Sequence, residues 1–358
     1  MNALTPTQRE LLHQGTVIPA HPLALNSQRQ LDERYQRALT RYYIDSGTGG
    51  VAVGVHTTQF EIREKGVDLL EPVLRLAAEE VARASLTRPF IKIAGIVGPT
   101  DQAQREADIA VDLGYDVGLV SNGGLHHLSE GALIQRTEKI AEIIPVFGFY
   151  LQPAVGGKVL SFDFWKDFAE IPNVVAIKMA PFNRYQTLDV VRAVCHSQRY
   201  REIALYTGND DNIVADLLTT YRFPVKGDIR EKSIVGGLLG HWAVWTRKAV
   251  ELLEEIKAIR KQGSTLPEDM LTRGIAITDA NAALFDAAHQ FRGCIAGIHE
   301  VLSRQGLLAG TWCLDPEEGL SAGQAEEISR VYAAYPELND DTFVREHLQR
   351  WLNDTDRT

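Results

Sequence analysis

The sequence predicts an α/β fold, specifically a (β/α)8 TIM barrel with additional C-terminal helices. Eight short runs rich in β-branched and aromatic residues each precede an amphipathic stretch with helical periodicity. Most of these runs are apolar throughout, which is typical of strands buried on both faces of a parallel sheet. A doubly wound open sheet is the alternative that shares this alternation.

Each expected strand is bounded by turn residues, and each expected helix has one apolar face. The strands are expected at Thr16–Ala20, Val51–Val55, Phe90–Ile96, Val117–Ser121, Pro145–Leu151, Val174–Met179, Ile203–Thr207 and Ser233–Leu238. The helices between them are expected at Gln30–Asp45, Gly66–Ala84, Gln102–Leu113, Glu130–Ile144, Phe162–Glu170, Gln186–His196, Asp211–Tyr221 and His241–Lys261.

We expect one domain with three parts. These are an N-terminal extension of residues 1–14, the barrel of residues 15–262, and C-terminal helices of residues 263–358 packed on the barrel. The polar stretch Lys261–Asp269 contains a glycine and a proline and marks the last boundary. From Leu266 onward the pattern is helical only.

Composition excludes several classes of protein. The 358 residues carry a net charge of −10, which argues against a nucleic-acid-binding protein, because such proteins show a basic excess. No apolar run approaches the roughly 18 residues of a membrane helix, so we expect no membrane partner. The beginning lacks an apolar segment after a basic one, so we expect no signal peptide. The three cysteines form no CxxC pair, which favours a reducing, cytoplasmic setting.

Lys178 is the most informative single residue. In a barrel, the reactive groups lie at the carboxyl ends of the strands, and Lys178 ends the apolar run Val174–Ile177. A lysine in an apolar barrel mouth has a lowered pKa, so that its neutral amine can attack a carbonyl and form a Schiff base. The alternative is a lysine that extends to solvent or pairs with a carboxylate. Lys92, within the run Phe90–Ala94, is a second candidate for the Schiff-base lysine.

Tyr150 ends the strand before that of Lys178, with one helix between them. A phenol there could relay protons to and from the reacting substrate. The alternative is a core tyrosine whose hydroxyl is satisfied by the fold.

These residues also carry a resemblance. The segments Tyr150–Gly157 and Ile171–Lys178 resemble the dihydrodipicolinate synthase/N-acetylneuraminate lyase (DapA-like) family of class I aldolases. That family has a Tyr-Asn-x-Pro segment, followed 28 residues later by the Schiff-base lysine. Here 178 minus 150 is also 28. Gly15–Ala20, Gly49–Thr58 and Tyr206–Asp210 resemble further segments of the family, and the similarity runs from about residue 15 to about residue 325.

The resemblance implies roles for the loops that follow the strands. Lys178 and Tyr150 would be catalytic. The residues implied in substrate binding are Gly54, His56, Thr57, Thr58, His126, His127, Gly208, Asn209 and Gly236. The lysine imine would carry the chemistry, so the resemblance implies neither a dissociable cofactor nor a metal. It also implies a homo-oligomer, a dimer or a homotetramer.

Three departures from the family pattern concern the substrate. The strand-2 motif Gly-Thr-Thr-Gly-Glu is replaced here by Gly54-Val-His-Thr-Thr58, so its register is open. The tyrosine expected after strand 4 is absent, and His126 and His127 stand there instead. The arginine that dihydrodipicolinate synthases use for the carboxylate of the second substrate is matched by Val155. Because valine cannot form that ion pair, we expect the chain not to be a true dihydrodipicolinate synthase. The aldehyde would be read by His126, His127 or Arg184, unless another arginine such as Arg230 reaches the site.

The histidines have a second interpretation. His56, His126, His127 and His241 could converge on a divalent metal, as in a metal-dependent aldolase. No H-x-H or HExxH spacing supports this, so proton transfer by a histidine is favoured and no metal is expected.

Together the patterns predict a Schiff-base-forming lyase or aldolase that acts on a 2-oxo acid such as pyruvate and on an unidentified aldehyde, both small molecules. Two alternatives stay open: a sugar-acid dehydratase that uses the same imine, and a non-catalytic member that binds a keto acid.

Overall fold

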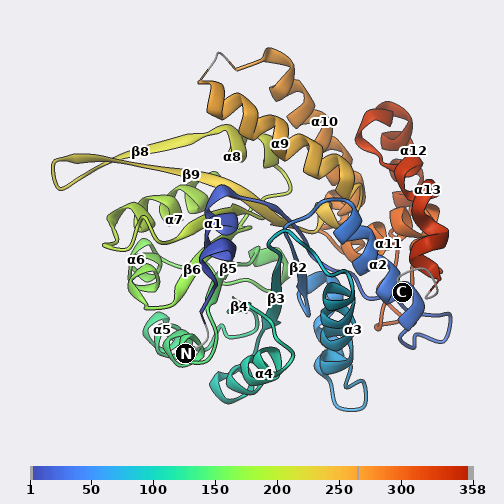
Figure 1. Ribbon diagram of the computed structural model, residues 1–358, viewed down its shortest axis with the longest axis horizontal. Coiled ribbons are helices and arrows are strands. Elements are labelled where there is room, and N and C mark those ends of the chain that lie inside the picture. Colours follow the sequence, from blue (N-terminus) through green and yellow to red (C-terminus); the bar gives the residue numbers. More distant parts are fainter. Residues whose placement is uncertain (1–2, 264–265, 354–358) are drawn as a thin grey trace. The chain divides into compact units, whose positions relative to one another are not determined.

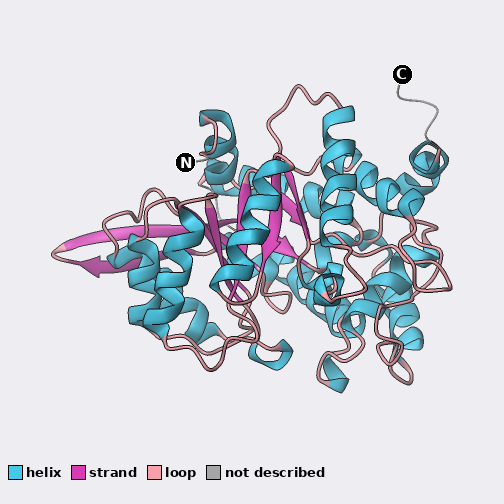
Figure 2. Ribbon diagram, turned by 90° about the horizontal axis from the view of Figure 1, so that it is seen from below, coloured by secondary structure: helices cyan, strands magenta, loops and turns pink. Residues whose placement is uncertain are grey.

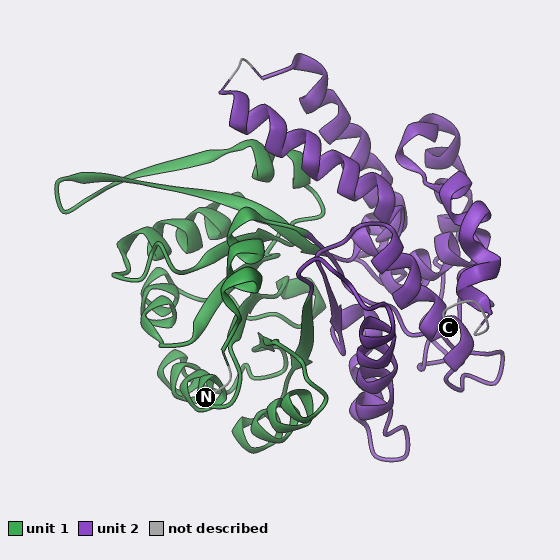
Figure 3. Cartoon of the chain, in the orientation of Figure 1, with its two compact units in different colours: residues 1–16, 91–238 green, residues 17–90, 239–358 purple. Residues whose placement is uncertain are grey.

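The structure is a computed structural model that describes residues 3–263 and 266–353. It divides into two compact units, each built from two separate stretches of the chain (Figure 3). Unit 1 comprises residues 1–16 and 91–238, and unit 2 comprises residues 17–90 and 239–358. The boundaries expected at residues 14 and 262 differ from this division, and they stay a prediction.

Unit 1 contains six parallel strands, hydrogen-bonded in the order β9, β7, β6, β5, β4, β3. Helices α4 to α7 alternate with them along the chain and lie on one side of the strands (Figure 1). The strands are β3 (Ile91–Ile96), β4 (Val117–Ser121), β5 (Val146–Tyr150), β6 (Val174–Met179), β7 (Ala204–Thr207), β8 (Thr220–Val225) and β9 (Asp228–Leu239). The helices are α1 (Pro6–Gln14), α4 (Thr100–Asp112), α5 (Glu130–Ala141), η3 (Pro153–Val155), α6 (Phe162–Glu170), α7 (Arg184–His196) and α8 (Ile213–Leu218).

The expected N-terminal extension contains helix α1. Thr5 and Gln8 form a capping box at its start, so two otherwise unpaired backbone N–H groups are satisfied. At its end, the Leu12 carbonyl accepts a hydrogen bond of 2.9 Å from the Tyr206 hydroxyl of β7. Gly15 follows with a positive φ of 83°, and a Cβ there would meet the Val235 carbonyl of β9. Helix α1 is therefore joined to the strands of its own unit.

A ribbon of two antiparallel strands, β8 and β9, extends from unit 1 (Figure 2). We call residues 220–233 the arm. Its turn consists of Lys226 and Gly227, which both have positive φ, as a two-residue hairpin turn requires. The helix expected over Asp211–Tyr221 is therefore wrong beyond Leu218, and the strand expected at Ser233–Leu238 begins earlier, at Asp228.

Unit 2 contains β1 and β2, which are joined by a parallel bridge between Ala20 and Ala52, and a set of helices. A buried ion pair between Arg41 of α2 and Glu80 of α3, at 2.6 Å, links the first two helices. The elements are β1 (Val17–Pro19), α2 (Glu33–Asp45), β2 (Gly50–Val53), η1 (His56–Thr58), η2 (Phe60–Arg63), α3 (Leu70–Arg83), η4 (His241–Ala243), α9 (Thr246–Gln262), α10 (Glu268–Leu284), η5 (Ala287–His289), α11 (Cys294–Arg304), α12 (Gln324–Ala334), η6 (Pro336–Leu338) and α13 (Asp341–Leu352).

The chain is a (β/α)8 barrel with additional C-terminal helices, and the predicted fold class is confirmed. The eight barrel strands are β1 to β7 and β9, each followed by a helix, and α10 to α13 are the additional helices. Within the described residues, no helix combines the length and the apolar character needed to cross a bilayer.

Candidate active site

Lys178 lies at the carboxyl end of β6, where it is paired with one aromatic residue on each neighbouring strand. It is paired with Phe149 of β5 and with Tyr206 of β7, so the three side chains leave the sheet on the same face. Its Nζ is 4.2 Å from the centroid of the Phe149 ring, and the residue is only 8% exposed. Burial lowers the pKa of Lys178 to about 8. The side chain therefore carries a substantial neutral fraction near physiological pH, as a nucleophilic lysine needs.

Gly208 gives the Lys178 side chain its space. A Cβ at Gly208 would lie 2.5 Å from Lys178 Cε and 2.8 Å from the Cβ of Ala180. No residue larger than glycine fits there while Lys178 keeps its place. Gly208 was predicted to bind substrate, and its observed contact is with the lysine.

Asp210 is the carboxylate that acts on Lys178. Its negative charge raises the pKa of the lysine, against the larger effect of burial. Asp210 follows β7 and is 8% exposed. Asp210 was not among the residues predicted from the sequence, although it directly follows Gly208 and Asn209 at a strand end. A carboxylate at the carboxyl end of a barrel strand is the signal that could have identified it.

Asn209 is held within the fold rather than offered to a ligand. Its Oδ1 accepts the Phe182 N–H at 3.0 Å, and its Nδ2 donates to Thr187 Oγ1 and to Asp216 Oδ2. Asp216 of α8 is fully buried, and it also accepts a hydrogen bond of 2.6 Å from the Thr207 hydroxyl. These contacts fix the turn that carries Asp210, so Asn209 has the contacts of a positioning residue.

Tyr150 leaves β5 on the face opposite to Lys178. Successive side chains of a strand alternate between faces, and it is Phe149 that contacts the lysine. The Tyr150 ring packs on Trp165 of α6, and its hydroxyl accepts the Leu160 N–H at 3.3 Å. Burial raises the pKa of the Tyr150 hydroxyl. The relay role of Tyr150 stays a prediction, and these contacts are those of a core tyrosine.

The loop after β2 in unit 2 carries two threonine hydroxyls, which differ in the number of hydrogen bonds that they form. Thr58 Oγ1 accepts the N–H groups of Gly54 and Val55 and donates to the His21 carbonyl at 2.7 Å. Thr57 Oγ1 donates to the same carbonyl at 3.3 Å. Thr58 therefore shapes the turn, and Thr57 keeps acceptor capacity. His56 is half-buried, with its ring 5.8 Å from Phe60.

The loops after β4 and β5 carry the residues expected to read the second substrate. His126 and His127 are exposed, and Lys158 Nζ donates to the carbonyls of His126 and Leu128. Val155 lies in η3, half-buried, on the adjoining loop. The Gly124 N–H donates to the Gly156 carbonyl, which joins the two loops.

Arg184 and Arg230, the two cations that would replace an arginine at position 155, form contacts with other groups. Arg184 pairs with Asp216. Arg230 lies in the arm and donates to the carbonyls of Cys195 and Ser197, where α7 ends. Because a barrel helix runs antiparallel to its strands, that end lies opposite to the carboxyl ends of the strands. The alternative in which Arg230 reaches the site is therefore wrong.

Gly236 has a packing role. A Cβ there would lie 2.6 Å from the Thr16 carbonyl oxygen and 2.7 Å from the Tyr206 ring. Its predicted part in substrate binding stays a prediction. Within residues 3–263 and 266–353, no group of three or more potential ligand side chains is placed to hold a metal ion.

A (β/α)8 barrel with a buried lysine at the end of β6 has the features of a class I aldolase. Comparison with known proteins agrees. The profile of the dihydrodipicolinate synthetase family matches residues 13–221. An N-acetylneuraminate lyase of Citrobacter koseri is 27% identical over 209 residues, which span 56% of this chain and 65% of the relative's length.

Solved structures show the same fold. Dihydrodipicolinate synthase of Oceanobacillus iheyensis superposes with a TM-score of 0.71 at 18% identity, covering 92% of this chain and 99% of that one. A second structure is that of YagE, a prophage protein of the dihydrodipicolinic acid synthase family from E. coli K12, in complex with pyruvate. It superposes with a TM-score of 0.71 at 18% identity, covering 90% of this chain and 98% of that one. The chain belongs to the dihydrodipicolinate synthetase family, whose enzymes are lyases of the class I aldolase type.

Proposed function

We propose that this enzyme forms a Schiff base between Lys178 and a 2-oxo acid of the pyruvate type, and then makes or breaks a carbon–carbon bond to an aldehyde. The observation that carries the proposal is the buried lysine at the end of β6, with its pKa lowered to about 8. The related YagE structure contains pyruvate, which supports this class of substrate.

The proposed reaction begins with attack of the neutral Lys178 Nζ on the C2 carbonyl carbon. The resulting carbinolamine takes up one proton and loses water to give a protonated imine. The imine withdraws electrons, so that a proton leaves C3 and an enamine forms. In the synthetic direction the enamine carbon adds to the aldehyde carbon, and the aldehyde oxygen takes up a proton in place of the one lost from C3. Hydrolysis of the imine then releases the product and the free lysine. No external cofactor enters these steps.

Asp210 is the proposed electrostatic partner of this cycle. Its negative charge favours the protonated nitrogen, both in the free lysine and in the imine. The carboxylate of the 2-oxo acid needs donors, and we propose Thr57 and the backbone of the strand-2 loop for this role. Loss of the Thr57 hydroxyl should then raise KM for pyruvate more than it lowers kcat.

Borohydride reduction in the presence of pyruvate tests the nucleophile. We expect one stable adduct, mapped to Lys178 by mass spectrometry and absent from Lys178→Ala. Lys232 is a matched control, because burial also lowers its pKa to about 8 while it lies in the arm. Labelling of Lys232 or Lys92 in place of Lys178 would contradict the proposal. An adduct without turnover on any aldehyde would indicate the non-catalytic alternative.

The second substrate is proposed to be an aldehyde other than aspartate semialdehyde. Val155 provides no cation, and Arg184 and Arg230 are held by other groups. Losing a bidentate ionic contact costs about 2–5 kcal/mol, or roughly 30-fold to several-thousand-fold in specificity. We therefore expect kcat/KM with pyruvate and aspartate semialdehyde to stay below about 10⁴ M⁻¹s⁻¹, a value ordinary for a native substrate. A steady-state assay that exceeds it would contradict this assignment.

A cytoplasmic homo-oligomer, a dimer or a tetramer, is the proposed form of the enzyme. The family resemblance supports it, and light scattering after size-exclusion chromatography tests it.

A further inference from the structure

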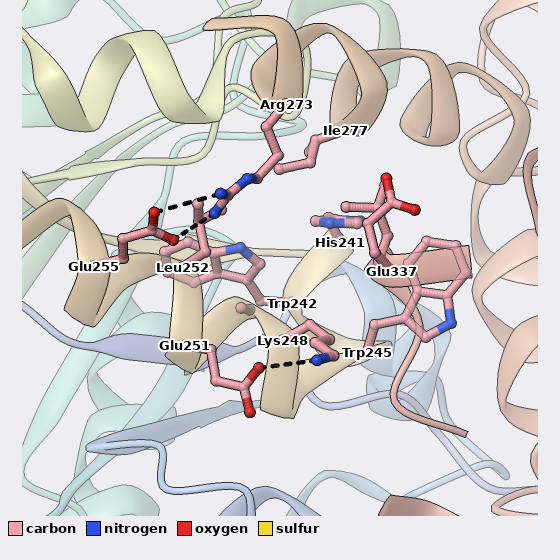
Figure 4. A pocket seen from close by; sticks show the side chains of 12 residues that line it. His241, Trp242, Trp245, Lys248, Glu251, Leu252, Glu255, Arg273, Ile277 and Glu337 are labelled. Carbon is pink, nitrogen blue, oxygen red and sulfur yellow. Dashed lines mark hydrogen bonds and ion pairs between the residues drawn. The ribbon is translucent and has the colours of Figure 1, made fainter. Parts of the chain in front are cut away.

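Unit 2 contains a cleft of about 260 Å³ (Figure 4). It lies among α9, α10 and η6, and residues from η4 also contribute to its lining. An engineered cavity of about 150 Å³ holds benzene, so this cleft has room for one aromatic ring with a short substituent. None of its lining residues belongs to the site around Lys178.

The inner surface of the cleft is apolar and firmly held. Trp242, Leu252 and Ile277 are buried there. Trp245 has a left-handed backbone with φ of 51°, which is rare for a bulky residue, and its Nε1 donates to the Tyr332 hydroxyl. Strain of this kind is kept where the surrounding structure fixes a side chain in place, often at a binding site.

The rim of the cleft has one carboxylate more than it has cations. Lys248 is paired with Glu251 at 3.0 Å, and Arg273 with Glu255 at 2.5 Å (Figure 4). Glu337 is exposed and forms no direct ion pair among the described residues, although its charge is one of those that raise the pKa of Arg273. Glu337, Trp245 and His241 all line the cleft (Figure 4). Burial lowers the pKa of His241 to about 4, so this ring adds no positive charge at neutral pH.

We propose that this cleft binds a small organic ammonium compound, with the charged nitrogen at Glu337 and the hydrocarbon body on the apolar inner surface. An anion would have to displace Glu251 or Glu255 from its cation, which costs an existing ion pair. A neutral molecule would leave Glu337 unused. The indole of Trp245 also favours a cation, because the face of an aromatic ring attracts positive charge. This site is independent of the function proposed for Lys178.

Three probes that share one phenyl ring and differ in charge test the proposal: benzylammonium, benzyl alcohol and benzoate. Titrations of the full chain are followed by calorimetry and by tryptophan fluorescence. We expect benzylammonium to bind at one site with a Kd below about 10 mM. It should bind at least fivefold more tightly than either of the other probes. Equal binding of the three, or no saturable binding of benzylammonium, would overturn the proposal.

Substitutions locate the site. Glu337→Gln should weaken benzylammonium binding at least fivefold, and Glu346→Gln on α13 is the matched control, which should leave it unchanged. Ile277→Trp should block the cleft and abolish binding. Both Glu337→Gln and Ile277→Trp should retain the pyruvate–borohydride adduct on Lys178, which shows that the chain is folded. Unchanged binding in Glu337→Gln and in Ile277→Trp would place the amine elsewhere and refute the proposal.

Discussion

Two opposing effects set the reactivity of Lys178. Burial lowers its pKa, and the negative charge of Asp210 raises it again, to a value of about 8. At this pKa about a tenth of the side chain is neutral at pH 7 and about nine tenths at pH 9. We therefore expect the rate of imine formation with pyruvate, measured by borohydride trapping, to rise with a midpoint near pH 8.

Asp210→Asn should move that midpoint to lower pH, because the charge that stabilises the ammonium form is removed. Asp211→Asn is the control, since Asp211 is the neighbouring carboxylate and is not a cause of the Lys178 shift. A midpoint that stays in place in Asp210→Asn would show that the two groups do not interact.

Tyr150→Phe separates a proton relay from a packing role. Since the hydroxyl accepts a hydrogen bond from Leu160, its loss should lower the free energy of unfolding by about 1 kcal/mol. We expect turnover to change by less than about tenfold, because Tyr150 and Lys178 leave their strands on opposite faces. Steady-state kinetics and urea unfolding give both numbers. A fall in kcat of about 10²–10⁴-fold would instead support the predicted relay role.

The spacing of 28 residues between Tyr150 and Lys178 predicts which strands carry the two residues, but it does not predict how the two strands pair. Val146 is paired with Val174, and a constant register from there would pair Tyr150 with Lys178. The register shifts by one residue after Val146, so that Phe149 takes that position. A one-residue shift moves every later side chain to the other face. Sequence identified the strand and the lysine, but it contains no signal for this shift.

At the scale of elements, the arm depends on Arg230. Its guanidinium donates to two carbonyls at the end of α7 and lies 4.4 Å from the Tyr200 ring centroid. A two-stranded ribbon is marginally stable without such support. Arg230→Ala should lower the free energy of unfolding by about 1.5–3 kcal/mol and speed amide exchange in the arm.

Arg222→Ala provides the control for this prediction. Arg222 pairs with Glu231 on the opposite face of the arm, where the two side chains are 67% and 53% exposed. Such an exposed pair contributes about 0–1 kcal/mol. Equal losses in the two variants, by urea unfolding, would contradict the anchoring role of Arg230.

Elements with continuous apolar runs were predicted well, and the arm was not. The ranges of β4, β6 and α6 agree with those expected from the sequence. In the arm, Thr220–Val225 alternates exposed and half-buried residues and contains a proline, so it lacks the signal of a barrel strand. The Lys226–Gly227 turn is also not one of the common hairpin dipeptides. This ribbon is defined by pairing with β9 and by contacts with α7. The sequence of the segment itself contains no signal for either of them.

At the scale of the whole molecule, three buried histidines predict sensitivity to acid. Burial lowers the pKa of His21, His241 and His299 to about 4, from 6.5. Below pH 6.5 the unfolded chain therefore binds protons that the folded chain does not, and stability falls towards pH 4. Each histidine contributes up to about 3 kcal/mol across this window. Glu318, with its pKa raised to about 7, acts oppositely between pH 4.5 and 7, as do Asp116, Asp211 and Asp340, whose pKa values burial also raises.

Urea unfolding at pH 7.5, 6.5, 5.5 and 4.5 measures this dependence. We expect the free energy of unfolding to fall steadily below pH 6.5. His299→Leu should make the fall less steep, and His127→Gln, at an exposed position, should leave it unchanged. A constant stability between pH 7.5 and 5.5 would contradict the assignment of these histidines as neutral groups.

The contact between Leu12 and Tyr206 has a consequence for synthesis on the ribosome. The two residues are separated by 194 positions in the chain. At about 5–20 residues per second, helix α1 waits roughly 10–40 s before its partner strand has been made. During this interval the side of α1 that later contacts β7 has no native partner, and a chaperone that binds nascent chains could occupy it. Helix α1 is thus translated long before the strand that fixes it in place.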